Sequence, residues 1–274
     1  MKWHLPLAVV ALAISAGASL AAAPRIVSMN ICTDQMLLAL ADPAQIIGLS
    51  RFARARQGWV EGAQKFPILS GGAEDILVLK PDVVTASQFD KRSTRDLLKA
   101  NGVNLVELPV PRSIGEVREQ IREMGNIAGH PERAAAEIAR LDAATAEARK
   151  LAGLRHFRVL PLSRRGWVPG GDSFVGAILK EAGLTNAAGE LGVDFGGFTS
   201  LEQIVQLKPD FLVVSDAGDR AEDDGSAFLL HPALERFYPR EKRIVIPERM
   251  TECGGVLLAD AIEALTKELK RVTK

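Results

Sequence analysis

The sequence has little of four things that would assign a function class at once: cysteine, histidine, aromatic residues and excess charge. Its 274 residues include 2 cysteines, 4 histidines and 5% aromatics, and 34 basic residues balance 34 acidic ones. An even charge balance gives no long-range field that attracts a polyanion. Two cysteines are too few for a disulfide scaffold, and their spacing matches no structural zinc motif. We therefore expect neither a nucleic-acid-binding protein nor a small disulfide- or zinc-stabilised domain.

Long hydrophobic runs are also missing beyond the N-terminus, and no later segment reaches the roughly 20 apolar residues that cross a bilayer. The N-terminus itself has a basic start, an apolar run over residues 5–20 and a small-x-small cleavage site at 19–21. This is the pattern of a secretory signal peptide. An uncleaved anchor helix is the alternative, against which Pro6 and Gly17 weigh. We expect residues 1–21 to be removed and the mature protein to be periplasmic.

Short strand-like runs alternate with helical patterns along the mature chain. The expected strands are 25–28, 46–50, 82–85, 103–108, 157–162, 211–214 and 243–246. The expected helices are 33–40, 74–79, 93–100, 174–182 and 256–270. Such alternation predicts an α/β protein with mainly parallel sheets.

The longest helical pattern lies between the two halves. It begins with Pro131, which suits a first helical turn, and ends before Gly153. About 22 residues at 1.5 Å each span roughly 33 Å, the width of a small domain. A helix packed on one sheet is the alternative, but the strand pattern restarts directly afterwards. We expect helix 130–153 to join an N-terminal lobe, 24–128, to a C-terminal lobe, 155–274.

The two halves share a repeated segment. Residues 74–84 and 202–212 both have a Glu, an Ile and a Leu-Lys-Pro-Asp turn at matching positions. Because proline cannot continue a helix, each copy predicts a short helix that ends before a turn into a strand. The duplication predicts two similar lobes with a cleft between them.

Together with the opening segment Ile-Val-Ser-Met-Asn-Ile-Cys-Thr-Asp-Gln at 26–35, these features resemble the periplasmic substrate-binding proteins of ABC importers for iron-siderophores and cobalamin. The resemblance implies two α/β lobes joined by a rigid helix and a bulky metal chelate held between them. It also implies delivery of the chelate to a membrane permease, with ATP hydrolysed by other subunits. We expect a monomer that uses no cofactor and is not an enzyme. A secreted enzyme that uses the same cleft is the alternative from another class.

Glu74 and Glu202 have two interpretations. Thr199-Ser-Leu-Glu202 has the form of a capping box, and Glu74 follows Gly71-Gly-Ala in a similar position, so both carboxylates could satisfy helix N-terminal amides. In the family that the chain resembles, glutamates at the matching positions dock on arginines of the permease. We expect the docking role.

Segments that follow the strands are expected to line the cleft, as in open α/β sheets generally. The candidate ligand-binding residues are Asn30, Cys32, Thr33, Arg51, Phe52, Gly71, Gly72, Gln88 and Phe89 in the first lobe, and Arg164, Arg165, Trp167, Phe198, Asp216, Glu248, Met250 and Thr251 in the second. Their aromatic rings would contact apolar faces of a chelate, and their arginines would pair with its oxygens. Taken singly, each Arg could be a solvated surface residue and each Phe a core residue.

This arginine content favours an anionic ferric siderophore as the first choice of ligand, with cobalamin as the alternative. Cys32 and Cys253 fall in opposite halves, on segments expected to face the cleft. A disulfide between them would cross-link the lobes and limit opening, and metal ligation by two thiolates is the alternative. Apart from that alternative, we expect the protein to make no direct metal contact.

Overall fold

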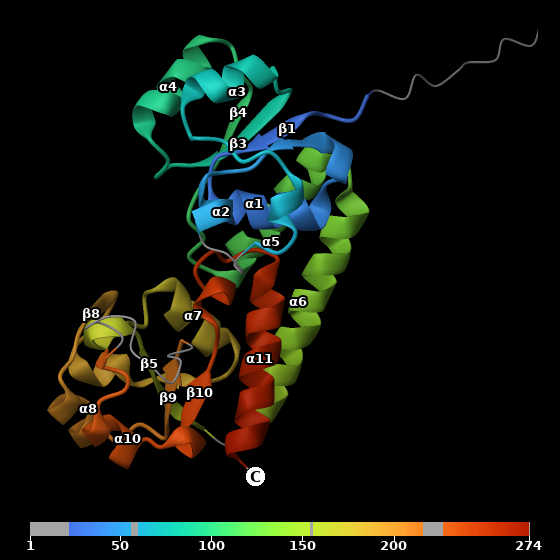
Figure 1. Ribbon diagram of the computed structural model, residues 1–274. Helices are drawn as coiled ribbons and strands as arrows, with labels where there is room; N and C mark the ends of the chain where they lie inside the picture. Colours follow the sequence, from blue (N-terminus) through green and yellow to red (C-terminus); the bar gives the residue numbers. More distant parts are fainter. Residues whose placement is uncertain (1–21, 56–59, 154–155, 216–226, 274) are drawn as a thin grey trace, which may run out of the picture.

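The computed structural model describes residues 22–55, 60–153, 156–215 and 227–273. The expected signal peptide and Asp216 lie outside these described residues. In Figure 1 two α/β units lie end to end beside a pair of long helices. No helix within the described ranges is long and apolar enough to cross a membrane.

The N-terminal sheet has four parallel strands in the order β2-β1-β3-β4. The strands are β1 (Ile26–Ser28), β2 (Ile46–Gly48), β3 (Val83–Ser87) and β4 (Leu105–Leu108). The helices are α1 (Ile31–Leu40), α2 (Phe52–Ala55), α3 (Ala73–Leu79), α4 (Arg92–Ala100) and α5 (Ile114–Ala128). All four expected strands are present, with ends that shift by at most two residues. Helix α5 is not among the expected helices.

The C-terminal sheet is also four-stranded and parallel, in the order β10-β9-β5-β7. Its strands are β5 (Arg158–Leu162), β7 (Thr185–Asn186), β9 (Phe211–Val214) and β10 (Arg243–Val245). Its helices are α7 (Phe174–Glu181), α8 (Leu201–Leu207), α10 (Pro232–Phe237) and α11 (Leu257–Val272). The prediction of an α/β fold with mainly parallel sheets is confirmed.

One pair of strands departs from the parallel pattern. Strands β6 (Trp167–Pro169) and β8 (Gly196–Phe198) pair antiparallel, with Trp167 opposite Phe198. Both are only three residues long, and β8 contains two glycines, so neither has the β-branched run by which a buried strand is recognised in a sequence. This pair extends the C-terminal lobe toward the N-terminal one.

Helix α6 (Pro131–Ala152) joins the lobes, and helix α11 (Leu257–Val272) packs beside it. Helix α6 has the expected length, with Pro131 in its first turn. Helix α11 runs beside α6 in the same direction (Figure 1). Ion pairs show this direction, since Arg140 pairs with Asp260 and, further along both helices, Glu147 pairs with Lys270. The chain therefore passes between the lobes through α6, and a second, parallel helix flanks it.

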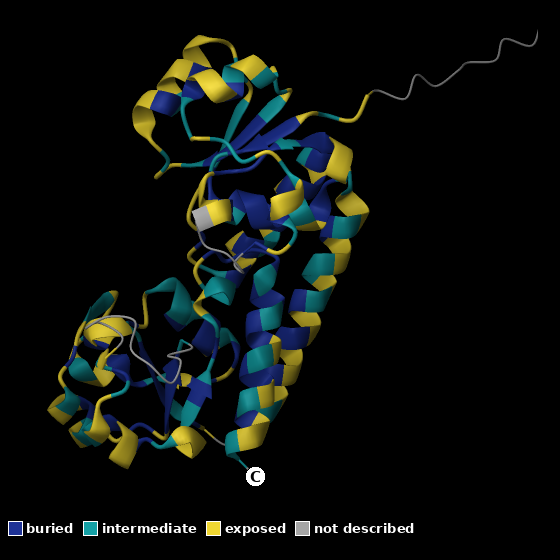
Figure 2. Ribbon diagram, in the orientation of Figure 1, coloured by how far each residue is buried: buried dark blue, intermediate teal, exposed yellow. Residues whose placement is uncertain are grey.

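The largest buried apolar cluster is continuous through both lobes. It includes Leu37 of α1, Met124 of α5, Leu141 of α6, Val159 of β5 and Leu265 of α11. In Figure 2 buried residues occur along both α6 and α11. Each fully buried side chain of this size contributes about 1.5 to 3 kcal/mol. The lobes therefore share one core along the helix pair, and a hinge there would have to break it.

Candidate ligand-binding cavity

A cavity of about 550 Å³ lies between the two sheets. On the N-terminal side it is bounded by segments that follow β1, β3 and β4, and on the C-terminal side by β6, the start of α7 and the segment after β10. This volume is in the range of small-molecule sites, and the carboxyl ends of parallel strands are where such sites form. The cavity therefore has the place and size expected for the ligand site.

Aromatic rings enter the cavity from both lobes. Phe89 of the N-terminal lobe is 76% exposed, and Phe195 of the C-terminal lobe is 75% exposed. Trp167 is held in place, because its ring meets Phe198 edge to face at 5.1 Å and Gly196 leaves no room for a side chain beside the indole. Large apolar rings that remain this exposed indicate a surface that is covered by something else in use.

The polar groups on the N-terminal side of the cavity, which we call its floor, mostly form hydrogen bonds within the protein. The Asn30 side chain caps α1, where its Oδ1 accepts from the backbone N–H groups of Cys32 and Thr33 at 3.0 Å each. Its Nδ2 donates to Asp90 at 3.0 Å, and Asp90 also accepts from the Ser87 N–H at 2.7 Å. The first turn of α1 is therefore held tightly against the loop after β3.

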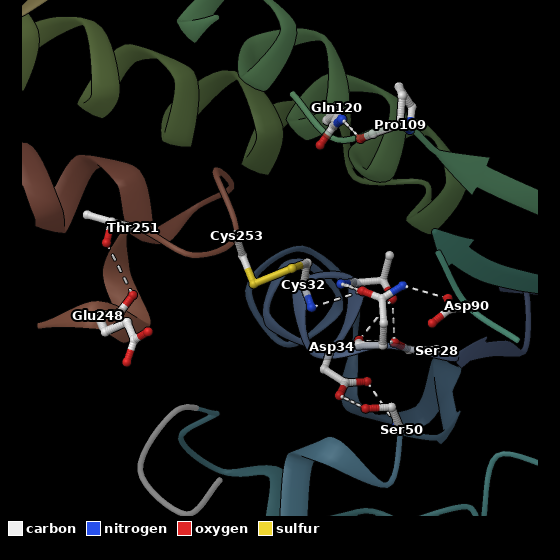
Figure 3. Close-up of a disulfide and its surroundings, with 12 residues drawn as sticks. Ser28, Cys32, Asp34, Ser50, Asp90, Pro109, Gln120, Glu248, Thr251 and Cys253 are labelled. Carbon is white, nitrogen blue, oxygen red and sulfur yellow. Dashed lines mark hydrogen bonds between the residues drawn. A yellow bond between two sulfur atoms is a disulfide. The ribbon is translucent and has the colours of Figure 1, made fainter. Parts of the chain in front are cut away.

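A disulfide joins Cys32 to Cys253, 221 residues apart, and both residues line the cavity. Figure 3 shows the bond crossing from α1 to the segment that precedes α11. The alternative of two free thiolates ligating a metal does not fit this bonded form. No group of three or more His, Cys, Asp or Glu side chains suited to a metal ion occurs in the described part of the chain.

Asp34 lies in the first turn of α1, next to the cavity-lining Thr33, and is completely buried. Its carboxylate accepts from the Ser50 backbone N–H at 3.0 Å and from the Ser50 hydroxyl at 2.5 Å (Figure 3). Burial nevertheless raises the pKa of Asp34 to about 6, because removal from water disfavours the charged form more than these hydrogen bonds favour it. Asp34 does not line the cavity, so it supports the floor and does not contact a ligand there.

The structure brings some of the expected ligand-binding residues together and leaves others apart. Those that line the cavity are Asn30, Cys32, Thr33, Phe89, Trp167 and Thr251, with Cys253. Those that do not line it are Arg51, Phe52, Gly71, Gly72, Gln88, Arg164, Arg165, Phe198, Glu248 and Met250. Arg51 instead stacks on the Phe52 ring at 4.9 Å and approaches Gly71 near the start of α3. Arg164 and Arg165 are exposed beside β6.

Several lining residues were not expected from the sequence. They are Met36, Ala86, Asp90, Leu108, Pro109, Val110, Pro111, Gln120, Pro169, Ser173, Phe174, Val175, Phe195 and Glu252. The segment 109–111 directly follows an expected strand, so the strand-end rule applied there would have found it. Phe195 depends on the β6–β8 pair, for which the sequence gives no signal.

Glu74 and Glu202 occupy matching places in the first turns of α3 and α8, and both are exposed. The expected capping box is wrong by one residue, because Ser200 caps α8 and its partner is Gln203. Glu202 is not the box partner. Its own backbone N–H and the Ser200 hydroxyl lower the pKa of its carboxyl, which keeps the group ionised.

Comparison with known proteins identifies the family. A cobalamin-binding protein of Halobacterium salinarum is 26% identical over 223 residues, which cover 77% of this chain but 59% of that protein. The periplasmic heme-binding protein RhuT from Roseiflexus sp. RS-1, in apo form, is 25% identical with a TM-score of 0.72, covering 92% of this chain and 100% of that one.

An ABC-type Fe³⁺-hydroxamate transport system protein from Saccharomonospora viridis DSM 43017 is similar in fold, with a TM-score of 0.66 at 21% identity, covering 90% of this chain and 93% of that one. Residues 26–243 match the family model described as periplasmic binding protein. The chain belongs to the periplasmic binding protein family.

Proposed function

We propose that this protein is the substrate-binding component of an ABC importer and that it captures a bulky, largely apolar metal chelate, with a corrinoid as the first choice. The observation that carries the proposal is the interlobe cavity, whose walls present Phe89, Trp167 and Phe195 to one space. Flat rings of this kind cover a large planar ligand with little loss of side-chain entropy. The cobalamin-binding relative supports this choice.

The charges around the cavity favour a ligand without strong negative charge. Its described lining residues include the carboxylates Asp90 and Glu252 but no Arg, Lys or His. An anionic siderophore would need cationic partners, since a buried charge without a partner is costly. The arginines on which the siderophore expectation depended lie outside the lining, so a corrinoid replaces the siderophore as first choice.

The metal of the ligand should bring its own donor atoms. Haem iron takes an axial ligand such as His, Met, Tyr or a Cys thiolate from a protein. Among the described lining residues only Met36 is of this type, and it is 2% exposed. A chelate whose coordination is already complete suits this cavity better than haem does.

Equilibrium binding tests the proposal. Cyanocobalamin, a ferric hydroxamate and hemin are titrated into the purified protein, and we expect cyanocobalamin to bind most tightly, without turnover. Trp167→Ala should weaken its binding at least tenfold at both low and high salt, because the lost contact is apolar. Arg164→Ala, three residues away, is the matched control and should leave binding unchanged. Tighter binding of the ferric hydroxamate, weakened by Arg164→Ala and by salt, would contradict the proposal.

Delivery to the permease is the second part of the proposal, with Glu74 and Glu202 as docking residues. Their exposure at matching places in the two lobes supports this role. Exposed ion pairs contribute only about 0 to 1 kcal/mol each, so they would set orientation more than affinity. Reversal of both charges should abolish uptake while ligand affinity stays unchanged. Reversal of Glu123 and Glu241, which are exposed elsewhere, is the control and should leave uptake intact.

A further inference from the structure

The disulfide between Cys32 and Cys253 lines the cavity and joins α1 of the N-terminal lobe to the segment that precedes α11. Cys32 is the second residue of α1, and Cys253 follows β10 of the C-terminal sheet. We propose that this disulfide is a clamp that fixes the separation of the cavity walls before a ligand arrives, so that ligand capture depends on the redox state of the two cysteines. Only the effect on affinity rests on the proposed function.

The residues after Cys253 are packed against both lobes. A Cβ on Gly254 would lie 2.4 Å from the Phe174 ring of α7 and 2.9 Å from Pro111, which follows β4. A Cβ on Gly255 would lie 3.4 Å from Cγ of Met36 in α1. The backbone of this segment therefore contacts the C-terminal and N-terminal walls at once. Fixing its position fixes how far apart the walls lie.

A clamp also needs a firm anchor at each end. At the first end, the Asn30 side chain caps the helix turn that carries Cys32. At the other end, Arg140 of α6 donates to the Val256 carbonyl at 3.2 Å and pairs with Asp260 at 2.9 Å. The disulfide thus links the N-terminal floor to the helix pair, so that displacement of one end would displace the other.

A disulfide that closes so long a loop also stabilises a protein by restricting its unfolded chain. Here the lobes already share a core along α6 and α11, so the reduced protein should stay folded. Reduction removes the covalent bond between the two walls of the cavity. The ligand would then have to order the walls when it binds, and the entropy lost in this ordering lowers affinity.

The redox step is thiol–disulfide exchange with a dithiol. One thiolate of the reductant attacks a sulfur of the Cys32–Cys253 bond to give a mixed disulfide, and its second thiol then displaces the protein sulfur. The two cysteines gain two electrons and two protons, and the dithiol becomes a disulfide.

The test compares ligand-free oxidised protein, protein reduced with dithiothreitol, and the double variant Cys32→Ser/Cys253→Ser. Hydrogen–deuterium exchange is followed at the amides of 251–256, and small-angle scattering gives the radius of gyration. We expect exchange at least tenfold faster without the disulfide, and an unchanged radius, because the shared core along α6 and α11 still holds the lobes together. With cyanocobalamin as the probe, Kd should rise at least tenfold. Leu234→Ala, in the separate C-terminal core cluster, controls for lost stability and should change neither the exchange nor Kd.

Equal exchange at 251–256 with and without the disulfide would overturn the clamp, whether or not cyanocobalamin binds. Failure of every form to bind cyanocobalamin would count against the corrinoid choice alone, since exchange and scattering need no ligand. Dithiothreitol should have no effect on the double variant. Should the serine pair unfold the protein, reduced wild-type protein gives the same comparison without a substitution.

Discussion

The two lobes are built on one plan. The N-terminal order β2-β1-β3-β4 corresponds to β7-β5-β9-β10, and each sheet is followed by a helix that packs on α6, α5 in one lobe and α11 in the other. They differ in that the C-terminal lobe has two additional strands. Along the chain, β6 comes before α7 and β7, and β8 comes after them. That addition carries Trp167 and positions Phe195. The common plan supplies the scaffold, and the departure from it supplies much of the aromatic wall.

The repeated Lys-Pro-Asp turns agree down to single hydrogen bonds. The carboxylate of Asp82 accepts from the Arg25 backbone N–H at 2.8 Å, and that of Asp210 accepts from the Arg158 N–H at 2.8 Å. Each arginine side chain also donates to the carbonyl of the lysine in its turn. Arg158 additionally forms an ion pair with Glu190. The repeated segment therefore forms a turn that ends a helix and joins two neighbouring strands through hydrogen bonds.

The largest expected effect concerns a buried carboxylate that α1 has and α7, its counterpart, lacks. Because burial raises the pKa of Asp34 to about 6 in the folded protein, its contribution to stability is fully present below about pH 4 and is lost as pH rises through 6. At about 1.4 kcal/mol per pKa unit, the loss is about 3 kcal/mol.

Urea unfolding of wild type and Asp34→Asn at pH 4.5 and 7.5 measures this loss. Asparagine keeps the shape and does not titrate, so the difference in unfolding free energy between the two proteins should shift by a large part of that amount in favour of the variant at pH 7.5. An equal difference at both pH values would mean that Asp34 titrates normally.

The pairing of β6 with β8 should be disrupted by the addition of one methyl group. A Cβ on Gly170 would lie 2.0 Å from the Asp194 carbonyl oxygen, which belongs to the backbone and cannot swing away. Gly170→Ala should therefore cost about 1 to 3 kcal/mol of unfolding free energy and weaken ligand binding by displacing Trp167. Gly171→Ala is the matched control, because nothing lies within 4 Å of its Cβ position. Equal stability of the two variants would show that β6 and β8 tolerate separation.

The sequence predicted the common plan well and the departure from it poorly. Strands such as 211–214 are short buried β-rich runs, and helix 131–152 has proline and glycine at its ends, so local signals suffice for both. Strands β6 and β8 are short and rich in Gly and Pro, and the residues that pair are separated by about 30 positions in the sequence. Their pairing depends on tertiary contacts that no local pattern contains.

For the candidate site, the strand-end rule found Asn30, Phe89 and Thr251 but wrongly placed Arg51, Arg164 and Arg165 in the cavity wall. Arg51 follows β2 as the rule requires, yet its side chain turns onto the Phe52 ring beside it. A strand end fixes where a loop begins. The direction of a long, flexible side chain depends on its neighbours, which the sequence does not reveal.

A smaller effect sharpens the equivalence of the repeated turns. Asp82→Ala and Asp210→Ala each remove the acceptor of one strand-end N–H at the same 2.8 Å distance. Each should cost about 1 kcal/mol, with the two values within about 0.5 kcal/mol of each other. Asp96→Ala, on the exposed face of α4, is the control and should change stability by less. A cost at only one turn, measured by urea unfolding, would show that the likeness of the turns does not extend to their energetics.

The smallest effect concerns the lysines that end α3 and α8. Lys80 and Lys208 have φ values of +47° and +50°, in the left-handed region where a side chain is strained and glycine is not. Lys80→Gly and Lys208→Gly should each stabilise the protein by about 0.5 kcal/mol, because relief of this strain exceeds the added flexibility of the unfolded chain. The turn hydrogen bonds use the lysine carbonyls, so they survive the change.

The matched control at each turn is alanine, which removes the lysine side chain but keeps the strain, and it should give no gain. Since the two turns lie in different lobes, their effects should add in the double glycine variant. Thermal unfolding of the single and double variants measures both points. A gain with alanine as large as with glycine would assign the effect to loss of the lysine charge and would remove the argument from backbone strain.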